Sequence, residues 1–153
     1  LGLLISAASN DVEASTTSTT AANLSSVTVS IPTTSLLLVV AGLSKSTGAA
    51  NNASIGLAIN GTEVKAPQAW TSSANASARG LVWFLIGPNL ASYERSMVGS
   101  AFSGTSGTST GFMGAEAADI PVGTITSITL RGLVGDALIT LRTNGLRVYE
   151  FTG

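Results

Sequence analysis

Short runs in which apolar and polar residues alternate, each ended by a turn residue, recur from Val27 to the end of the chain. Residues 27–31 and 55–59 are clear examples. Successive side chains of a strand point to opposite faces, so a period of two is typical of strands with one buried face. No segment keeps the 3.6-residue apolar period of an amphipathic helix. The sequence therefore predicts an all-β protein.

The apolar runs and the turn residues between them predict the strand order. Further strands are predicted at residues 36–43, 62–64, 79–86, 93–103, 121–130, 137–141 and 146–151. The dipeptides Asn60-Gly61 and Asn144-Gly145 favour two-residue hairpin turns, so each is predicted to join two antiparallel strands. About eight short strands spaced by turns are typical of an antiparallel jelly-roll sandwich. Trp83 lies inside the apolar run GLVWFLIG and is assigned to the core.

The first 26 residues have a different character. Leu1, Leu3, Leu4 and Ile5 form an apolar head, and the low-complexity run ASTTSTTAANLSS follows at residues 14–26. Small polar residues cannot pack a core, so this run is predicted to be an extended linker. The predicted organisation is an N-terminal arm and linker at 1–26 and a jelly-roll domain at 27–153. The apolar head is predicted to contact a neighbouring subunit, with docking on its own body or disorder as the alternatives.

Charge and hydropathy narrow the set of partners. Charged residues make up 10% of the 153 residues, well below the roughly 25% usual in soluble domains, while 40 residues are Ser or Thr. The net charge is -1 and the seven Lys and Arg residues stand singly, so we expect no nucleic-acid partner. The longest apolar runs fall far short of the roughly 20 residues of a membrane helix, so we expect no membrane partner.

Residues suited to catalysis are scarce. The chain has no His and no Cys, which removes the commonest general base, the commonest metal ligand and thiolate chemistry. Residues 107–111 read GTSTG and match the G-x-S-x-G pattern of hydrolases, but no His stands anywhere to take the serine proton. Glu116 and Asp119 match no calcium-loop spacing. We predict a non-enzyme with no catalytic residue, cofactor or metal site.

Three aromatic residues are candidate inter-subunit or ligand contacts. Trp70 lies in the polar stretch APQAWTSS, where an aromatic side chain is placed for contact with a ligand or a neighbouring subunit. Tyr149 and Phe151 alternate with Leu146 and Val148 in the last predicted strand, so both faces of that strand are partly apolar. We expect one face to be covered by the core and the other by a partner subunit.

Four strand patterns carry a resemblance to a known family. They are SLLLVVAGLSKS, SIGLAINGTEV, ITSITL at residues 125–130 and LRVYEF at residues 146–151. In this order they resemble a jelly-roll domain of tailed-bacteriophage virion proteins, of the head-decoration and tail-fibre-tip type. The resemblance implies a structural or adhesive role on the virion surface, a homotrimeric assembly and no catalytic residue.

Three functions are compatible with these observations. The first is a capsid decoration or cement protein whose trimer contacts the major capsid protein or other virion subunits and stabilises the shell through its N-terminal arm. The alternative is a tail-fibre or tail-tip module that recognises host glycans. The second alternative is a subunit of a cell-surface filament that donates its N-terminal strand to the next subunit.

Overall fold

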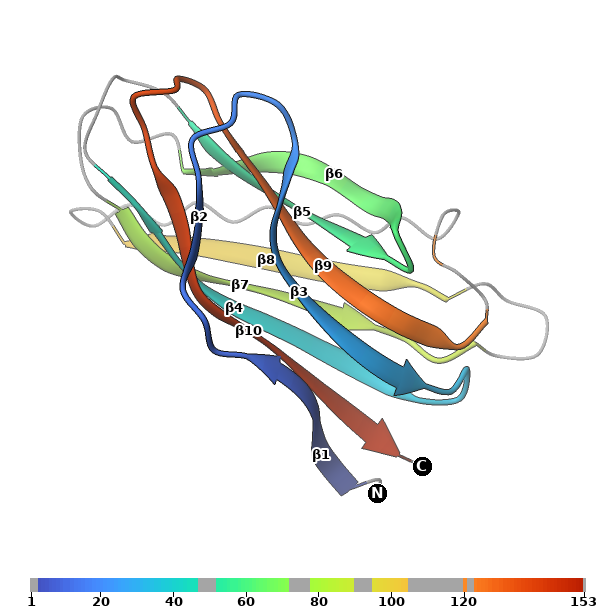
Figure 1. Ribbon diagram of the computed structural model, residues 1–153. Coiled ribbons are helices and arrows are strands. Elements are labelled where there is room, and N and C mark those ends of the chain that lie inside the picture. The colour runs from blue at the N-terminus through green and yellow to red at the C-terminus, as the bar shows by residue number, and fades with distance from the viewer. Residues whose placement is uncertain are drawn as a thin grey trace.

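The computed structural model describes residues 3–46, 52–71, 78–89, 95–104, 120 and 123–152, and these form a β-sandwich (Figure 1). The strands in these ranges are β1 (Leu3–Asn10), β2 (Ala14–Thr16), β3 (Ala22–Ile31), β4 (Leu36–Lys45), β5 (Ala53–Ile59), β6 (Thr62–Thr71), β7 (Ala78–Ile86), β8 (Met97–Gly104), β9 (Ile125–Val134) and β10 (Leu141–Thr152). The described part of the chain has no helix that is long and apolar enough to cross a membrane.

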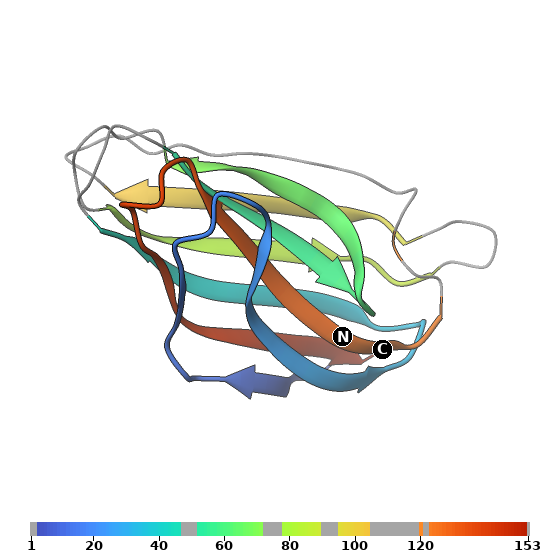
Figure 2. The same cartoon turned by 45° about the horizontal axis from the view of Figure 1, so that its top comes forward.

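The strands form two antiparallel sheets. The six-stranded sheet has the order β1-β10-β4-β7-β8, with β2 also paired to β10, and the four-stranded sheet has the order β3-β9-β5-β6, as far as the described residues extend. Figure 2 shows the two sheets stacked as layers, with β3, β9, β5 and β6 lying over β10, β4 and β7. The prediction of an all-β antiparallel sandwich is confirmed.

The strand pairing identifies the sandwich as a jelly roll. β1 and β2 pair with β10, β3 with β9, β4 with β7, and β5 with β6, so early strands pair with late ones in a nested series. This nesting is the arrangement of a long hairpin rolled into two sheets. β8 adds one more strand at the edge beyond β7. The ends of β1 and β10 lie side by side, with Leu3 opposite Thr152 (Figure 1).

Alternate residues of both sheets fill one core. In β4 every second side chain is buried. The same alternation in β7 buries Val82, Phe84 and Ile86. Each fully buried Leu, Ile or Phe contributes roughly 1.5–3 kcal/mol of hydrophobic stabilisation. Gly99 of β8 is needed opposite Phe84, because a Cβ added there would lie 2.5 Å from Phe84 Cδ1.

The N-terminal segment is part of the sandwich. The run predicted to be a linker contains β2 and the start of β3, and Leu24 within it is 4% exposed in the core. The linker prediction is therefore wrong for these residues, because β10 and β9 supply backbone partners that composition does not reveal. The segment predicted to be an arm contains β1, which pairs with β10 of the same chain.

The two Asn-Gly dipeptides have different conformations. Asn60 and Gly61 have φ values of 51° and 79°, as the predicted two-residue hairpin between β5 and β6 requires. The second predicted hairpin is wrong: Asn144 and Gly145 lie within β10, where the pairing with β4 shifts between Thr143 and Leu146. Gly145 has a φ of 140° in this β-bulge, a value that strongly favours glycine.

The predicted strand at 137–141 is also wrong except for Leu141, which begins β10, because residues 137–140 form a turn and a short link that lead into that strand. The backbone nitrogen of Leu138 donates to Asp136 Oδ1 at 2.9 Å, and that of Ile139 donates to the Asp136 carbonyl oxygen at 3.0 Å. An aspartate side chain that bonds to the backbone two residues later is typical of turns. Leu138 is 77% exposed, whereas Ile139 is fully buried, so this turn still contributes one side chain to the core.

Candidate interaction face

The outer face of the six-stranded sheet is apolar over the part that holds the first half of β4 and the residues beside it on β7, β8 and β10. In β4, residues Leu37, Val39 and Ala41 point into the core, so the half-buried residues between them point outward. We call the outward set the apolar face: Leu36, Leu38 and Val40 of β4, Leu81, Trp83 and Leu85 of β7, Val98 of β8, and Tyr149 and Phe151 of β10. No element in the described ranges lies over this face.

Strand register brings these residues together. Leu38 is opposite Tyr149 on one side and opposite Leu85 on the other, so three neighbouring strands present apolar side chains in one row. Leu85 is in turn opposite Val98 of β8. Residues directly opposite each other in antiparallel strands have Cβ atoms about 4.5–5.5 Å apart, so their side chains are in contact. The partial burial of the row comes from these neighbours.

Trp83 belongs to this face. The assignment of Trp83 to the core is wrong: its side chain is half-buried on the outer side of β7, and its neighbours Val82 and Phe84 are the ones in the core. It pairs with Val40 on β4 and with Ser100 on β8. A large aromatic side chain on the outer face is characteristic of protein contact sites, where Trp and Tyr supply much of the binding energy.

One end of the apolar face is hollowed. A shallow cavity of about 240 Å³ is lined by Leu36, Leu85 and Val98 of the face and by three residues at the ends of β7 and β8: Gly87, Ser96 and Met97. Such a hollow can receive an apolar side chain of a partner.

The outer face of the four-stranded sheet is polar instead. Ser26 Oγ of β3 and Thr129 Oγ1 of β9 lie 2.9 Å apart and share a hydrogen bond. Arg131 of β9 forms an ion pair with Glu63 of β6 on the same side. Thr28 of β3 is exposed there, opposite Ser127 of β9. This alternation of buried apolar and exposed polar residues is usual for an antiparallel sheet with one face in water.

Ion pairs join the N-terminal segment to β10 at the border of the apolar face. Arg147 Nε donates to Asp11 Oδ1 at 3.0 Å, and Arg142 Nη1 lies 3.5 Å from Glu13 Oε1. Hydrogen bonds with Tyr149 and with Asp11 raise the pKa of Arg147. Both pairs are more than half exposed, so each contributes little to stability.

The predicted contact residues are placed as follows. Tyr149 and Phe151 lie on the apolar face. Leu3, Leu4 and Ile5 lie in β1, with Leu4 opposite Phe151, although their side chains lie outside the described part of the chain. Leu1 also lies outside it. Trp70 is in β6 of the other sheet, and its side chain is likewise outside the description. The contact roles of these residues remain predictions.

Sequence reasoning missed most of the apolar face. The runs LLLVVAGL and GLVWFLIG carry the signal that could have revealed it. A strand with one face in water alternates apolar and polar residues, whereas these two runs are apolar on both faces. The GTSTG motif at 107–111 and the acidic residues Glu116 and Asp119 lie outside the described residues. Within the described ranges, no group of three or more acidic side chains is placed to hold a metal ion.

Two buried charged side chains hold the turn between β3 and β4. The Ser35 hydroxyl donates to the carboxylate of Glu150, which is 8% exposed. Arg95 is fully buried and its Nη2 donates to the carbonyl oxygen of Pro32 at 2.9 Å. Burial lowers the pKa of Arg95. Each group is bound to a turn residue, while Nε and Nη1 of Arg95 are buried without a hydrogen-bond partner among the described residues.

Comparisons with known proteins give a distant structural likeness. No protein-family model matches the chain, and no curated protein sequence matches it. Among solved structures, the VP2 subviral particle of infectious bursal disease virus is 16% identical with a TM-score of 0.46, over 99% of this chain and 32% of that one. The structure of the Gt strain of the same virus is 17% identical with a TM-score of 0.42, over 99% and 33%.

These structural similarities do not establish the function of the chain. The chain spans about a third of the length of those two proteins. TM-scores below 0.5 leave the function to be inferred from the chain's own surfaces. The structures named come from infectious bursal disease virus and not from a tailed phage, so the assignment to the phage family remains a prediction.

Proposed function

We propose that this chain is a non-enzymatic structural subunit of a virion, and that it assembles as a homotrimer through the apolar face. More specifically, we propose that it is a decoration or cement protein on the surface of a phage capsid, in contact with the major capsid protein or with other virion subunits. The carrying observation is the apolar outer face of the six-stranded sheet, with Trp83, Tyr149 and Phe151 on it.

The physical support is the cost of leaving such a face in water. Apolar surface removed from water contributes about 25 cal/mol per Å². Contiguous apolar patches of several hundred Å² on soluble proteins usually mark contact sites. The net charge of -1 leaves little electrostatic repulsion between copies of the chain. In addition, the strand patterns at residues 31–151 resemble those of phage jelly-roll domains that form trimers.

β1 extends the proposed contact beyond the apolar face. It is the last strand of its sheet in the described residues, so one edge of its backbone is open to pairing with another chain. Pairing at that edge would give the N-terminal arm, including Leu1, Leu3, Leu4 and Ile5, its role in clamping a neighbouring subunit. Many such contacts in a symmetric shell would add to high avidity.

The test is the mass of the native assembly, measured by light scattering over a concentration series. The proposal predicts a discrete trimer that dissociates on dilution and is weakened by Trp83→Ser. A chain that stays monomeric at all concentrations would overturn it. An open-ended polymer would support the strand-donating filament instead, since open polymers need a non-closing contact.

A second measurement separates decoration from adhesion. The purified chain is mixed with empty capsids and with host-type glycans presented on an array. Binding to capsids is the result expected for a decoration protein. Binding to glycans that Trp70→Ala abolishes would favour the tail-tip alternative.

A further inference from the structure

The end of the six-stranded sheet opposite the shallow apolar cavity carries a concentration of positive charge. Ser44 of β4 is opposite Arg142 of β10 on one side and opposite Arg79 of β7 on the other. Opposed residues of antiparallel strands point to the same face, so the two guanidinium groups flank the Ser44 hydroxyl. Strands about 4.8 Å apart place the two arginine backbones about 10 Å from each other.

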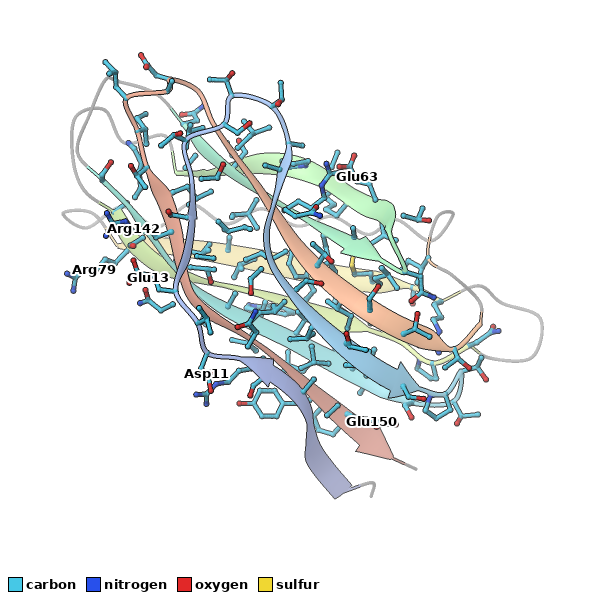
Figure 3. The ribbon with its side chains drawn as sticks, viewed as in Figure 1. Asp11, Glu13, Glu63, Arg79, Arg142 and Glu150 are labelled. Atoms are coloured by element: carbon cyan, nitrogen blue, oxygen red, sulfur yellow. The ribbon has the colours of Figure 1, made fainter. Side chains whose placement is uncertain are left out.

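A hollow lies between these arginines. Its cavity of about 390 Å³ is lined by Arg79, Arg142 and Ser44 together with Glu13, Asn144, Gly42, Leu43 and Gly80. A second cavity of about 260 Å³ shares Ser44 and both arginines, and Lys45 and Ser46 also line it. We call these two cavities, which share Ser44 and both arginines, the arginine hollow. Figure 3 shows Arg79, Arg142 and Glu13 together at this end of the sheet.

The charges in the hollow are unbalanced. Arg142 has one weak partner, the Glu13 carboxylate at 3.5 Å, and both side chains are more than half exposed. Arg79 is exposed and takes part in no ion pair within the described residues. The hollow is therefore lined by two exposed guanidinium groups and one carboxylate, in a chain whose net charge is -1.

We propose that the arginine hollow binds an acidic sugar, with the sugar carboxylate held between Arg79 and Arg142 above Ser44. Arginine presents its donors as a planar fork that matches a carboxylate. The other lining groups, the Asn144 amide and the Ser46 hydroxyl, suit the hydroxyls of a sugar ring. The larger of the two cavities, at about 390 Å³, is within the roughly 300–1,000 Å³ of small-molecule sites.

Glu13 explains why a sugar acid fits better than an inorganic anion. Glu13 repels any anion held between the arginines, but it repels phosphate, which carries more than one negative charge near neutral pH, more than the single carboxylate of a sugar acid. A sugar acid brings one carboxylate for the arginines and neutral hydroxyls that can donate a hydrogen bond to Glu13. All of these groups come from one chain, so the site does not depend on the proposed trimer.

The test is calorimetric titration of the full chain with glucuronate, with glucose and inorganic phosphate as the comparison ligands, at low ionic strength. We expect glucuronate to bind with a dissociation constant on the order of 1 mM, and glucose and phosphate to bind at least about tenfold more weakly. Arg79→Gln and Arg142→Gln should each weaken glucuronate binding about tenfold. Gly42→Leu should block it by filling the hollow; an added Cβ there meets only Asn144 Cβ, at 3.9 Å.

Arg147→Gln is the matched control. Arg147 lies on the same face of β10 and has an acidic partner, but it does not line the hollow. Binding that falls as much in Arg147→Gln as in Arg142→Gln would show a diffuse charge effect and overturn the proposal. Phosphate binding as tight as that of glucuronate would overturn the sugar assignment, and equal glucose binding would overturn the role of the arginines. Light scattering on the same samples reports the assembly state separately.

Discussion

The two outer faces of this sandwich share one core and have opposite surfaces. The four-stranded sheet presents Ser26, Thr28 and the Arg131–Glu63 ion pair, whereas the six-stranded sheet presents Leu38, Trp83 and their apolar neighbours. The backbone pairing is antiparallel in both, so hydrogen bonding does not explain the contrast. The difference lies in which side chains occupy the outward positions. We conclude that one face is suited to water and the other to a partner.

The largest expected effect is a difference in stability between substitutions at two adjacent residues of β7. Phe84→Ala should lower the free energy of unfolding by about 3–5 kcal/mol, because the ring is buried in the core and its loss leaves a cavity. Trp83→Ala should cost the dissociated chain less than about 1 kcal/mol, because the indole is on the outer face. Urea denaturation of dilute samples measures both. Equal losses would mean that Trp83 is packed like a core residue.

The next effect compares the faces directly. Leu38→Glu places a charge in the middle of the apolar face, and Thr28→Glu places the same charge on the polar face. We expect Leu38→Glu to weaken subunit association by at least about 2 kcal/mol, or about 30-fold, and Thr28→Glu to leave it unchanged. Sedimentation equilibrium gives the association constants. An equal loss in both variants would remove the distinction between the faces.

The two sheets differ in how much of their structure could be predicted from the sequence. Alternation predicted β3 and β5, because one face of each run is plainly polar or small. The run around Trp83 is apolar throughout, so its period could not say which side chains point inward. That choice is made by the register with β4 and β8, which pairs Phe84 with Val39 and Gly99.

Long-range pairing also explains the other errors. Asn60-Gly61 and Asn144-Gly145 are alike locally, but only the second is held between β4 and the N-terminal segment, which makes it a bulge. The arginine hollow could not be found in the sequence either. Arg79 and Arg142 come together only because β7 and β10 both pair with β4.

The bulge of β10 provides a smaller test within the six-stranded sheet. Gly145→Ala should lower the free energy of unfolding by about 1–3 kcal/mol, because φ is 140° and a Cβ would lie 3.0 Å from the Asn10 carbonyl oxygen. Gly123→Ala is the control, since no atom lies within 4 Å of a Cβ there. Thermal and urea unfolding measure both variants. Similar stability in the two would show that the bulge tolerates a side chain.

The smallest expected effect concerns the ion pairs of the two sheets. Glu63→Gln should cost about 0.2–1 kcal/mol, because its partner Arg131 is 24% exposed. Asp11→Asn should cost less, since Arg147 and Asp11 are 56% and 57% exposed. Neither change should alter the association constant. A loss of association in Glu63→Gln would place a subunit contact on the polar face.

The exposure of Trp83 on assembly tests the central claim most directly. The chain has two tryptophans, so Trp70→Phe leaves Trp83 as the single reporter. Acrylamide quenching of its fluorescence is measured across the concentration range in which light scattering records assembly. If the apolar face is the subunit contact, quenching falls as the trimer forms. Quenching that stays constant while the mass rises would show that the subunits meet elsewhere and would contradict the account.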